Sequence, residues 1–143
     1  MFSSKKCWKN LENVHKLINF ASQNRIITME KIRNITLFRN YFKEFYVAQT
    51  DAVRSKINFV LKLVETQRII PKKFFCFIEG SDGIYEIRVE IDSNIYRIFC
   101  CLDEGAVVVL FHGFQKKTQK TPQKEIKRAE FIKKEYFKSK EDK

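Results

Sequence analysis

Apolar and polar residues alternate most strictly between residues 85 and 91, where the sequence reads YEIRVEI. Such alternation places the two sets of side chains on opposite faces of a β-strand, and it predicts a strand over residues 84–91. Asp92 and Ser93 suit a two-residue turn, after which residues 94–102 (NIYRIFCCL) predict a second strand of a hairpin. The apolar run 106–111 (AVVVLF), which follows a tight turn at 103–105, is typical of a third, buried strand.

A helical period replaces the alternation in two earlier segments. In each, large apolar residues recur three or four positions apart, which indicates an amphipathic helix. The first set is Leu37, Tyr41, Phe42, Phe45 and Tyr46, and the second is Val53, Ile57, Val60, Leu61 and Val64. Thr50 and Asp51 are suitable N-cap residues for the second helix.

The remaining segments complete the expected fold. Residues 31–36 predict a short first strand, and residues 122–137 predict a closing helix that begins at Pro122 and buries Ile126, Ala129 and Ile132. Phe74, Phe75 and Phe77 are expected in a loop folded over the core. The order β-α-α-β-β-β-α predicts an α+β fold with a small, mainly antiparallel sheet packed by helices.

The first 28 residues differ from the rest. A short helix over residues 8–20 is one interpretation, and it would be an added element for partner binding. We prefer a second interpretation, in which residues 1–28 are an extension or a mis-annotated start and the compact domain occupies residues 29–143, beginning at Met29.

Charge narrows the class of partner. The 143 residues contain 28 Lys and Arg against 17 Asp and Glu, which gives a net charge of +11. Such a surface favours nucleic acid. We do not expect a membrane partner, because no apolar run approaches the ~18 residues that span a bilayer.

The cysteines point to a reducing compartment. Cys7, Cys76, Cys100 and Cys101 lack metal-ligand spacing, and no secretory signal is visible, so we expect no metal and a cytoplasmic protein. Cys100 and Cys101 should point to opposite faces of the sheet, one in the core and the other a free thiol.

Two arginines form the first candidate site. A two-residue turn at Asp92 and Ser93 places Arg88 directly opposite Arg97. Like charges opposite one another destabilise a sheet, so a bound phosphate is one reason to keep such a pair. The alternative is a charge ladder in which Glu86 and Glu90 neutralise the arginines diagonally.

A lysine-rich segment forms the second candidate site. Residues 112–122 read HGFQKKTQKTP and lie between the expected third strand and the closing helix. Its lysines, its threonines and the helix N-terminus all suit an anion. The alternative is an ordinary solvated loop. The arginine pair one strand away favours the anion site.

Three of these motifs together resemble the RelE/HigB superfamily of toxins, and in particular its phage-related HigB-like branch. They are the segments YEIR (85–88), YRIF (96–99) and VLFHGFQKKTQKTP (109–122), and the resemblance spans residues 30–138. It implies a metal-independent endoribonuclease without cofactors that cuts mRNA on the ribosome. It also implies a cognate antitoxin, which in this branch is often a helix-turn-helix protein.

The resemblance also implies roles for individual residues. Arg88, Arg97 and Lys117 are carried over as the catalytic cations. Lys116, Thr118 and Lys120 are expected to bind RNA, and Phe114 to stack on a base.

The general acid or base stays open between Glu86 and His112. A simple register places His112 on the face opposite Arg97, in the core, whereas a bulge at Gly105 would reverse this. Glu86 lies on the arginine face, where a salt bridge is the competing role.

Two other functions remain compatible with the sequence. One is a non-catalytic toxin of the same fold that acts on a protein such as gyrase. The other is a basic RNA- or ribosome-binding module without turnover. The arginine pair and the lysine segment favour the nuclease over the gyrase poison, but a binding module would need the same cations.

Overall fold

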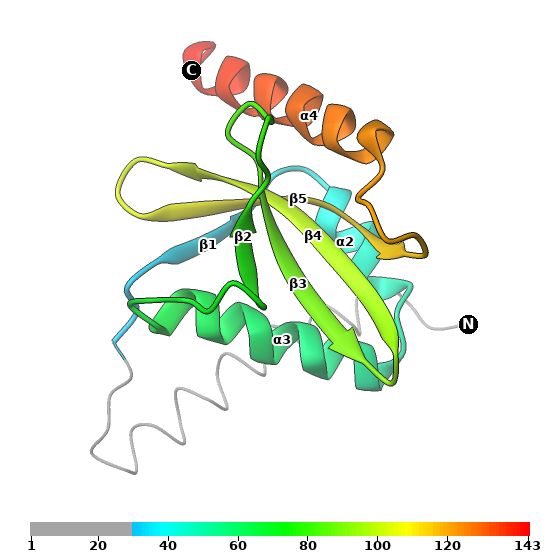
Figure 1. Ribbon diagram of the computed structural model, residues 1–143. Helices are drawn as coiled ribbons and strands as arrows, with labels where there is room; N and C mark the ends of the chain where they lie inside the picture. The colour runs from blue at the N-terminus through cyan, green and yellow to red at the C-terminus, as the bar shows by residue number, and fades with distance from the viewer. Residues whose placement is uncertain (1–29) are drawn as a thin grey trace.

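The computed structural model describes residues 30–143, which form three helices and a five-stranded sheet (Figure 1). The expected α+β fold is confirmed. The expected N-terminal helix and extension, residues 1–28, lie outside the described residues. In chain order the elements are β1 (Asn34–Leu37), α2 (Tyr41–Val47), α3 (Asp51–Thr66), β2 (Phe75–Phe77), β3 (Tyr85–Ile91), β4 (Asn94–Asp103), β5 (Val107–Lys116) and α4 (Gln123–Glu141).

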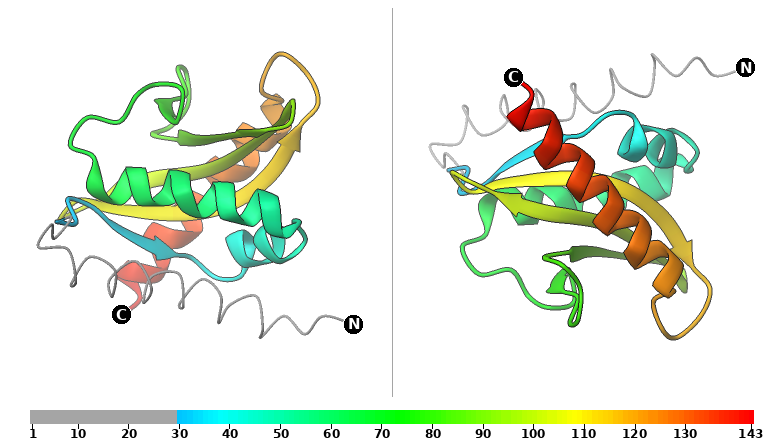
Figure 2. Two further views of the ribbon diagram at one scale, coloured as in Figure 1. Left: turned by 90° about the horizontal axis from the view of Figure 1, so that it is seen from below. Right: turned by 90° about the horizontal axis from the view of Figure 1, so that it is seen from above.

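The sheet is mixed, with the strand order β1-β5-β4-β3-β2. The strand β1 runs parallel to β5, and all other neighbours are antiparallel. The helices α2 and α3 lie on one face of the sheet and α4 crosses the other (Figure 2). The sheet is therefore the middle layer of three, and each of its faces has its own hydrophobic core.

The alternation along β3 and β4 divides the side chains between the two cores. Ile87, Val89 and Ile98 face α2 and α3, where they pack with Phe42, Ile57 and their neighbours. Phe99 and Cys101 face α4, where they pack with Ile126, Ala129 and Ile132. Thr50 is the N-cap of α3, as expected, and its hydroxyl accepts a hydrogen bond from the amide of Val53 at 3.3 Å.

The structure corrects the expected strand boundaries. The strand β1 is shifted to Asn34–Leu37, so that Leu37 belongs to a strand and not to a helix. The predicted phenylalanine loop contains a short edge strand, β2, which pairs with β3 and stacks the ring of Phe75 on that of Tyr85 at 5.1 Å. The run FFCF does not alternate between apolar and polar residues, and for this reason the sequence pattern did not indicate a strand there.

The two adjacent cysteines are both in the core. Cys100 and Cys101 point to opposite faces, as expected, but each is fully buried as a free thiol. The expectation that one of them would lie outside the core was wrong, because helices cover both faces of β4. Burial raises the pKa of Cys101 to about 11, so the thiol stays protonated at neutral pH. Within residues 30–143, no helix is long and apolar enough to cross a bilayer.

Candidate nucleic-acid interface

The expected arginine pair forms as the sequence predicts. The hairpin turns at Asp92 and Ser93, both with positive φ, and Arg88 is the direct cross-strand neighbour of Arg97. Both side chains lie on the α4 face of the sheet. They are closer to the hairpin turn than Phe99 and Cys101, which α4 buries.

Glu86 lies between the two arginines. Its Oε1 accepts a hydrogen bond from Nε of Arg88 at 2.8 Å and forms an ion pair with Nη2 of the same guanidinium at 2.7 Å. Its Oε2 lies 3.4 Å from Nε of Arg97 on the neighbouring strand. Part of the predicted charge ladder is therefore present, because one carboxylate offsets the repulsion between two guanidinium groups.

Burial separates the roles that the two arginines can take. Arg97 is only 5% exposed, and one of its guanidinium nitrogens donates to the carbonyl of Tyr96 at 3.1 Å. Burial lowers the pKa of Arg97, and Arg88 lowers it further, while Glu86 opposes both effects. The Arg88 side chain keeps 32% of its surface exposed, so it is the more accessible cation of the pair.

Two polar atoms at the centre of this group lack hydrogen bonds within residues 30–143. They are Oε2 of Glu86 and Nε of Arg97, which face each other at 3.4 Å with poor geometry. Buried polar atoms are nearly always satisfied in folded proteins. These two atoms are therefore the least well satisfied point of the group.

Lys116, on β5, lies on the same face of the sheet as the two arginines. It is the last residue of β5, where it pairs with Ile95, so β5 extends five residues beyond the predicted strand end. Burial lowers the pKa of Lys116, and Arg97 and Arg88 lower it further. We call Glu86, Arg88, Arg97 and Lys116 the charged cluster.

The other residues of the lysine segment lie in an exposed loop. Lys117, Thr118 and Lys120 follow the end of β5 and precede α4, and the hydroxyl of Thr118 donates to the carbonyl of Lys120 at 2.8 Å. This bond is local and links two exposed residues of the loop. The structure thus places Lys116 in the sheet and leaves Lys117 and Lys120 exposed to solvent.

His112 lies on the same face as Arg97, contrary to the simple register. A bulge does reverse its side, but not at Gly105: Ile98 pairs with Gly113 and Cys100 with Leu110, so two residues of β5 lie opposite Phe99. The extra residue turns the imidazole towards α4. Its Nε2 lies 2.8 Å from Oε2 of Glu125, in the first turn of that helix.

The surroundings of His112 keep it neutral and closed off. It is 2% exposed, and the rings of Phe99 and Phe114 pack against it at centroid distances of 5.4 and 6.2 Å. Burial lowers the pKa of His112, and the hydrogen bond to Glu125 only partly opposes this effect. Phe114 is the cross-strand neighbour of Arg97, so its half-buried ring separates His112 from the charged cluster.

Sequence reasoning missed one neighbour of the cluster. Cys76 on β2 is the cross-strand partner of Glu86, and its half-buried thiol therefore faces the same side of the sheet. Only the recognition of β2 as a strand could have placed it there. Among the described residues, no group of three or more His, Cys, Asp or Glu side chains could hold a metal ion.

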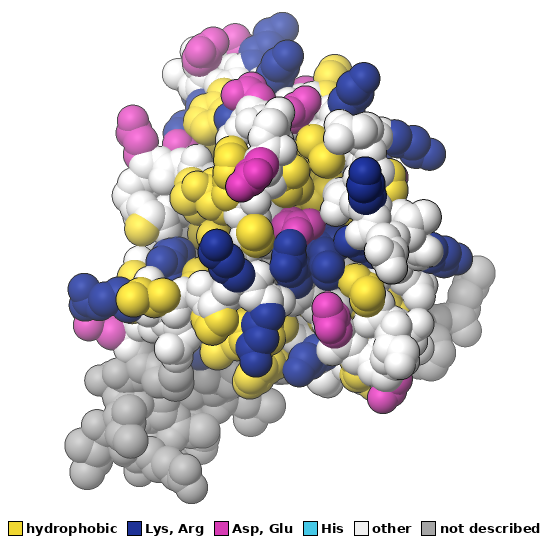
Figure 3. All heavy atoms as spheres, viewed as in Figure 1, with side chains coloured by type: hydrophobic (Ala, Val, Ile, Leu, Met, Phe, Trp, Pro, Cys, Tyr) yellow, Lys and Arg dark blue, Asp and Glu magenta, His cyan; other side chains and the backbone are white. Residues whose placement is uncertain are grey.

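The surface around the cluster is strongly basic. Lys and Arg side chains gather over β3 and β4 in the middle of the face shown in Figure 3, with some acidic side chains among them. A concentration of cations on one face is the electrostatic footprint of a polyanion site. The cations that a phosphodiester can reach here are the partly exposed Arg88 and, in the adjoining loop, the exposed Lys117.

The chain matches a known protein family. Residues 44–134, more than half of the chain, match a family model described as phage derived protein Gp49-like (DUF891). This range contains the whole charged cluster and the loop that follows it. No curated protein matches the chain.

Proposed function

The chain belongs to the phage-derived Gp49-like family, a RelE-type toxin family, and from that premise we propose that it is an endoribonuclease that cuts mRNA on the ribosome. Members of RelE-type families are often endoribonucleases, and a toxin of this kind implies a cognate antitoxin. The finer assignments are our proposal: a type II toxin close to the HigB-like branch, neutralised by a helix-turn-helix antitoxin.

The charged cluster is the observation that carries this proposal. Arg88 and Arg97 face each other across two strands, Glu86 holds them at 2.7 to 3.4 Å, and Lys116 completes the group. Guanidinium groups that are fixed before the substrate arrives need no reorganisation when charge develops on a phosphate. Preorganised cations of this kind are suited to stabilise a phosphoryl-transfer transition state.

The reaction that these groups support needs only RNA itself as the nucleophile. The 2′-hydroxyl attacks the adjacent phosphorus, the bond from phosphorus to the 5′-oxygen breaks, and a 2′,3′-cyclic phosphate forms. Arg88 and Lys117 contact the non-bridging oxygens, and Arg97 strengthens the local positive potential from its buried position. The 2′-hydroxyl proton goes to a base, and the departing 5′-oxygen takes a proton from water.

Glu86 is the better of the two candidate bases. Its Oε2 has no hydrogen-bond partner among the described residues and lies at the cluster, whereas His112 is enclosed by Phe99 and Phe114. A carboxylate is in general a weak base towards a hydroxyl proton. The ribosome would then contribute by orienting the message, because positioning alone can supply much of the rate.

The burial of both candidate bases favours one alternative function. Glu86 is 5% exposed and His112 is 2% exposed, so neither reaches solvent freely in the unbound protein. A basic module that binds RNA or the ribosome without cutting would need the same cations and no base. The two functions differ only in turnover.

The test is therefore a cleavage assay. Purified protein is added to ribosomes that hold a defined message, and the RNA ends are mapped by primer extension and tested for a 2′,3′-cyclic phosphate. We expect breaks that require the ribosome and persist in EDTA concentrations that leave the ribosome assembled. Tight ribosome binding with an intact message would instead establish the non-catalytic module.

A further inference from the structure

The exposed side of α4 carries mainly basic residues, and the charged cluster does not account for them. Six basic residues of this helix are exposed, while its acidic residues before the last turn are only partly exposed. The exposed cations are Lys124, Lys127, Arg128, Lys134, Lys138 and Lys140.

Each of those acidic residues is engaged by another element of the protein. Glu125 bonds His112 at 2.8 Å, and Glu130 accepts from the amide of Asp82 at 2.9 Å. Glu135 accepts from the hydroxyl of Tyr41 at 3.0 Å and pairs with Arg39 at 3.1 Å. The carboxylates thus attach α4 to the sheet and to the preceding segments, and they do not neutralise its outward lysines.

Four of the exposed lysines have no anionic partner. Lys124, Lys127, Lys134 and Lys138 form no ion pair with any residue of the described range 30–143. Lys140, by contrast, is bound to Asp103 at 2.6 Å. The spacing of three, four and seven residues puts the four free lysines on one side of the helix, over about 21 Å of its length.

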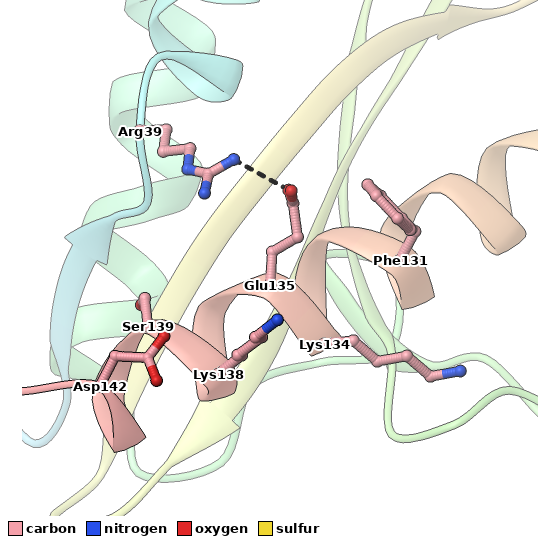
Figure 4. Close-up of a pocket in the computed structure, with 7 residues that line it drawn as sticks. All are labelled: Arg39, Phe131, Lys134, Glu135, Lys138, Ser139 and Asp142. Carbon is pink, nitrogen blue, oxygen red and sulfur yellow. Dashed lines mark ion pairs between the residues drawn. The ribbon is translucent and has the colours of Figure 1, made fainter.

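An aromatic ring lies in the middle of these lysines. Phe131 is 61% exposed, although it belongs to a helix whose other large apolar residues pack on the protein. With Lys134 and Lys138 it lines an open cavity of about 470 Å³ (Figure 4). The other lining residues are Arg39, which pairs with Glu135, and Ser139 and Asp142 near the end of the helix. We call Lys124, Lys127, Phe131, Lys134 and Lys138 the α4 stripe.

We propose that the α4 stripe is a second RNA-binding surface, which takes a single-stranded segment with its phosphates on the lysines and a base on Phe131. The choice of RNA rests on the proposed function. It is supported by continuity, because the stripe begins at Lys124, in the first turn of α4, directly after the lysine loop that follows Lys116. A basic track with an interleaved aromatic is how proteins bind single strands without sequence preference.

An acidic protein segment is the competing occupant. It too would be attracted by the lysines, and it could place an apolar side chain on Phe131. The continuous track towards the charged cluster favours RNA, because one strand can then occupy the cluster, the loop and α4 in succession. Binding at the stripe would thereby add affinity without contacting the reacting phosphate.

The test compares matched charge reversals on two helices. The double variant Lys134→Glu/Lys138→Glu changes the α4 stripe, and Lys56→Glu/Lys62→Glu makes the same change of charge on α3, across the sheet. The probe is a fluorescent single-stranded 2′-O-methyl oligouridylate, which lacks the attacking hydroxyl and cannot be cut. Affinity is measured by anisotropy over a salt series, after circular dichroism has shown that both variants are folded.

We expect the α4 double variant to bind at least about tenfold more weakly at low salt than the α3 variant. Its slope of log affinity against log salt should fall by about 1.4, since each lost single-strand phosphate contact removes ~0.7. Phe131→Ala should weaken binding about fivefold or more with an unchanged slope, whereas Phe59→Ala on α3 should have little effect.

Equal losses in the two double variants would overturn the proposal, because only net charge would then matter. So would unchanged RNA binding in the α4 variant together with lost binding of poly-glutamate, which would identify a surface for acidic proteins. The proposed cleavage activity is tested separately with Arg88→Ala on ribosomes. Since the probe cannot be cut, absence of cleavage in the wild-type protein would leave the result for the α4 stripe intact.

Discussion

The two faces of the sheet are built from the same strands but are used differently. The face under α2 and α3 is a continuous apolar core in which Phe42, Ile57, Val60 and Val64 are almost fully buried. The face under α4 begins the same way, but towards the β3–β4 turn its apolar residues give way to Glu86, Arg88 and Arg97. Of the four buried charged or histidine side chains in residues 30–143, three lie on this second face: Glu86, Arg97 and His112.

This difference in helix coverage shows how one sheet can hold an apolar core on one face and closely spaced charges on the other. Two helices cover the first face, whereas a single helix crosses the second and leaves the hairpin end uncovered (Figure 2). At that end Arg88 keeps 32% of its side-chain surface exposed, whereas Arg97 is buried beside the carboxylate of Glu86, which offsets its charge. The first face supplies stability, and the second can then carry like charges close together.

The largest effect is expected when a cation is removed from the charged cluster. Arg88→Ala should lower single-turnover cleavage on ribosomes by about 10²- to 10³-fold, because a preorganised cation is lost from the transition state. The unfolding midpoint should fall as well, because the variant removes the hydrogen-bond donor of the buried Glu86 carboxylate, so cleavage is compared per folded molecule. Arg68→Ala, an exposed arginine after α3, is the matched control; cleavage equally reduced in both variants would refute a specific role for Arg88.

The next largest effect is expected when a core residue under α2 and α3 is truncated. Ile57→Ala should lower the free energy of unfolding by about 3 kcal/mol, because Ile57 is fully buried and the truncation leaves a cavity. Cleavage per folded molecule should stay at the wild-type value under conditions where the variant is folded. Urea unfolding measures the first quantity and an active-site titration the second, with Ile57→Val as a graded control. A loss of activity in the folded fraction would show that the two faces are coupled.

The smallest effect is expected from the titration of His112, and it tests whether this residue belongs to the core or to the site. Burial holds its folded pKa below the value of the unfolded chain, so the unfolded state binds more protons as the pH falls. The stabilisation from neutral His112 is therefore complete above pH ~6.5 and is lost as the pH decreases towards the folded pKa. The measurement is urea unfolding between neutral and mildly acidic pH for the wild type and for His112→Gln.

In His112→Gln the part of the pH dependence due to the imidazole should disappear, and cleavage should show no new dependence on pH. A glutamine can still donate to Glu125, which limits the loss of stability at neutral pH. If the variant instead removes the acidic limb of the cleavage profile, His112 is the base and the assignment to Glu86 is wrong.

The local sequence pattern was sufficient to predict much of the fold and two of the four residues of the charged cluster, Arg88 and Arg97. The alternation of YEIRVEI and the turn at Asp92 and Ser93 determined the register that sets Arg88 opposite Arg97. Helical spacing determined the buried faces of α3 and α4, including Ile57 and Ile132. These features depend on interactions between residues that are close in sequence, so the sequence alone is sufficient to predict them.

Features that depend on distant partners were decided only by the tertiary structure. The run FFCF became β2 because the edge of β3 was available to it, and Lys116 became part of β5 because β4 extends alongside. The bulge that brings His112 to the α4 face lies opposite Phe99, where the imidazole can reach Glu125.

The sequence by itself determined a basic α+β domain with an arginine pair on one hairpin. The tertiary structure decided that Glu86 joins the pair, that Lys116 belongs with it, and that α4 turns its lysines outward while its acids bind the protein. The physical reason is that side-chain pairing and burial depend on which elements meet across the sheet. That is settled by packing between segments far apart in the chain and not by local pattern.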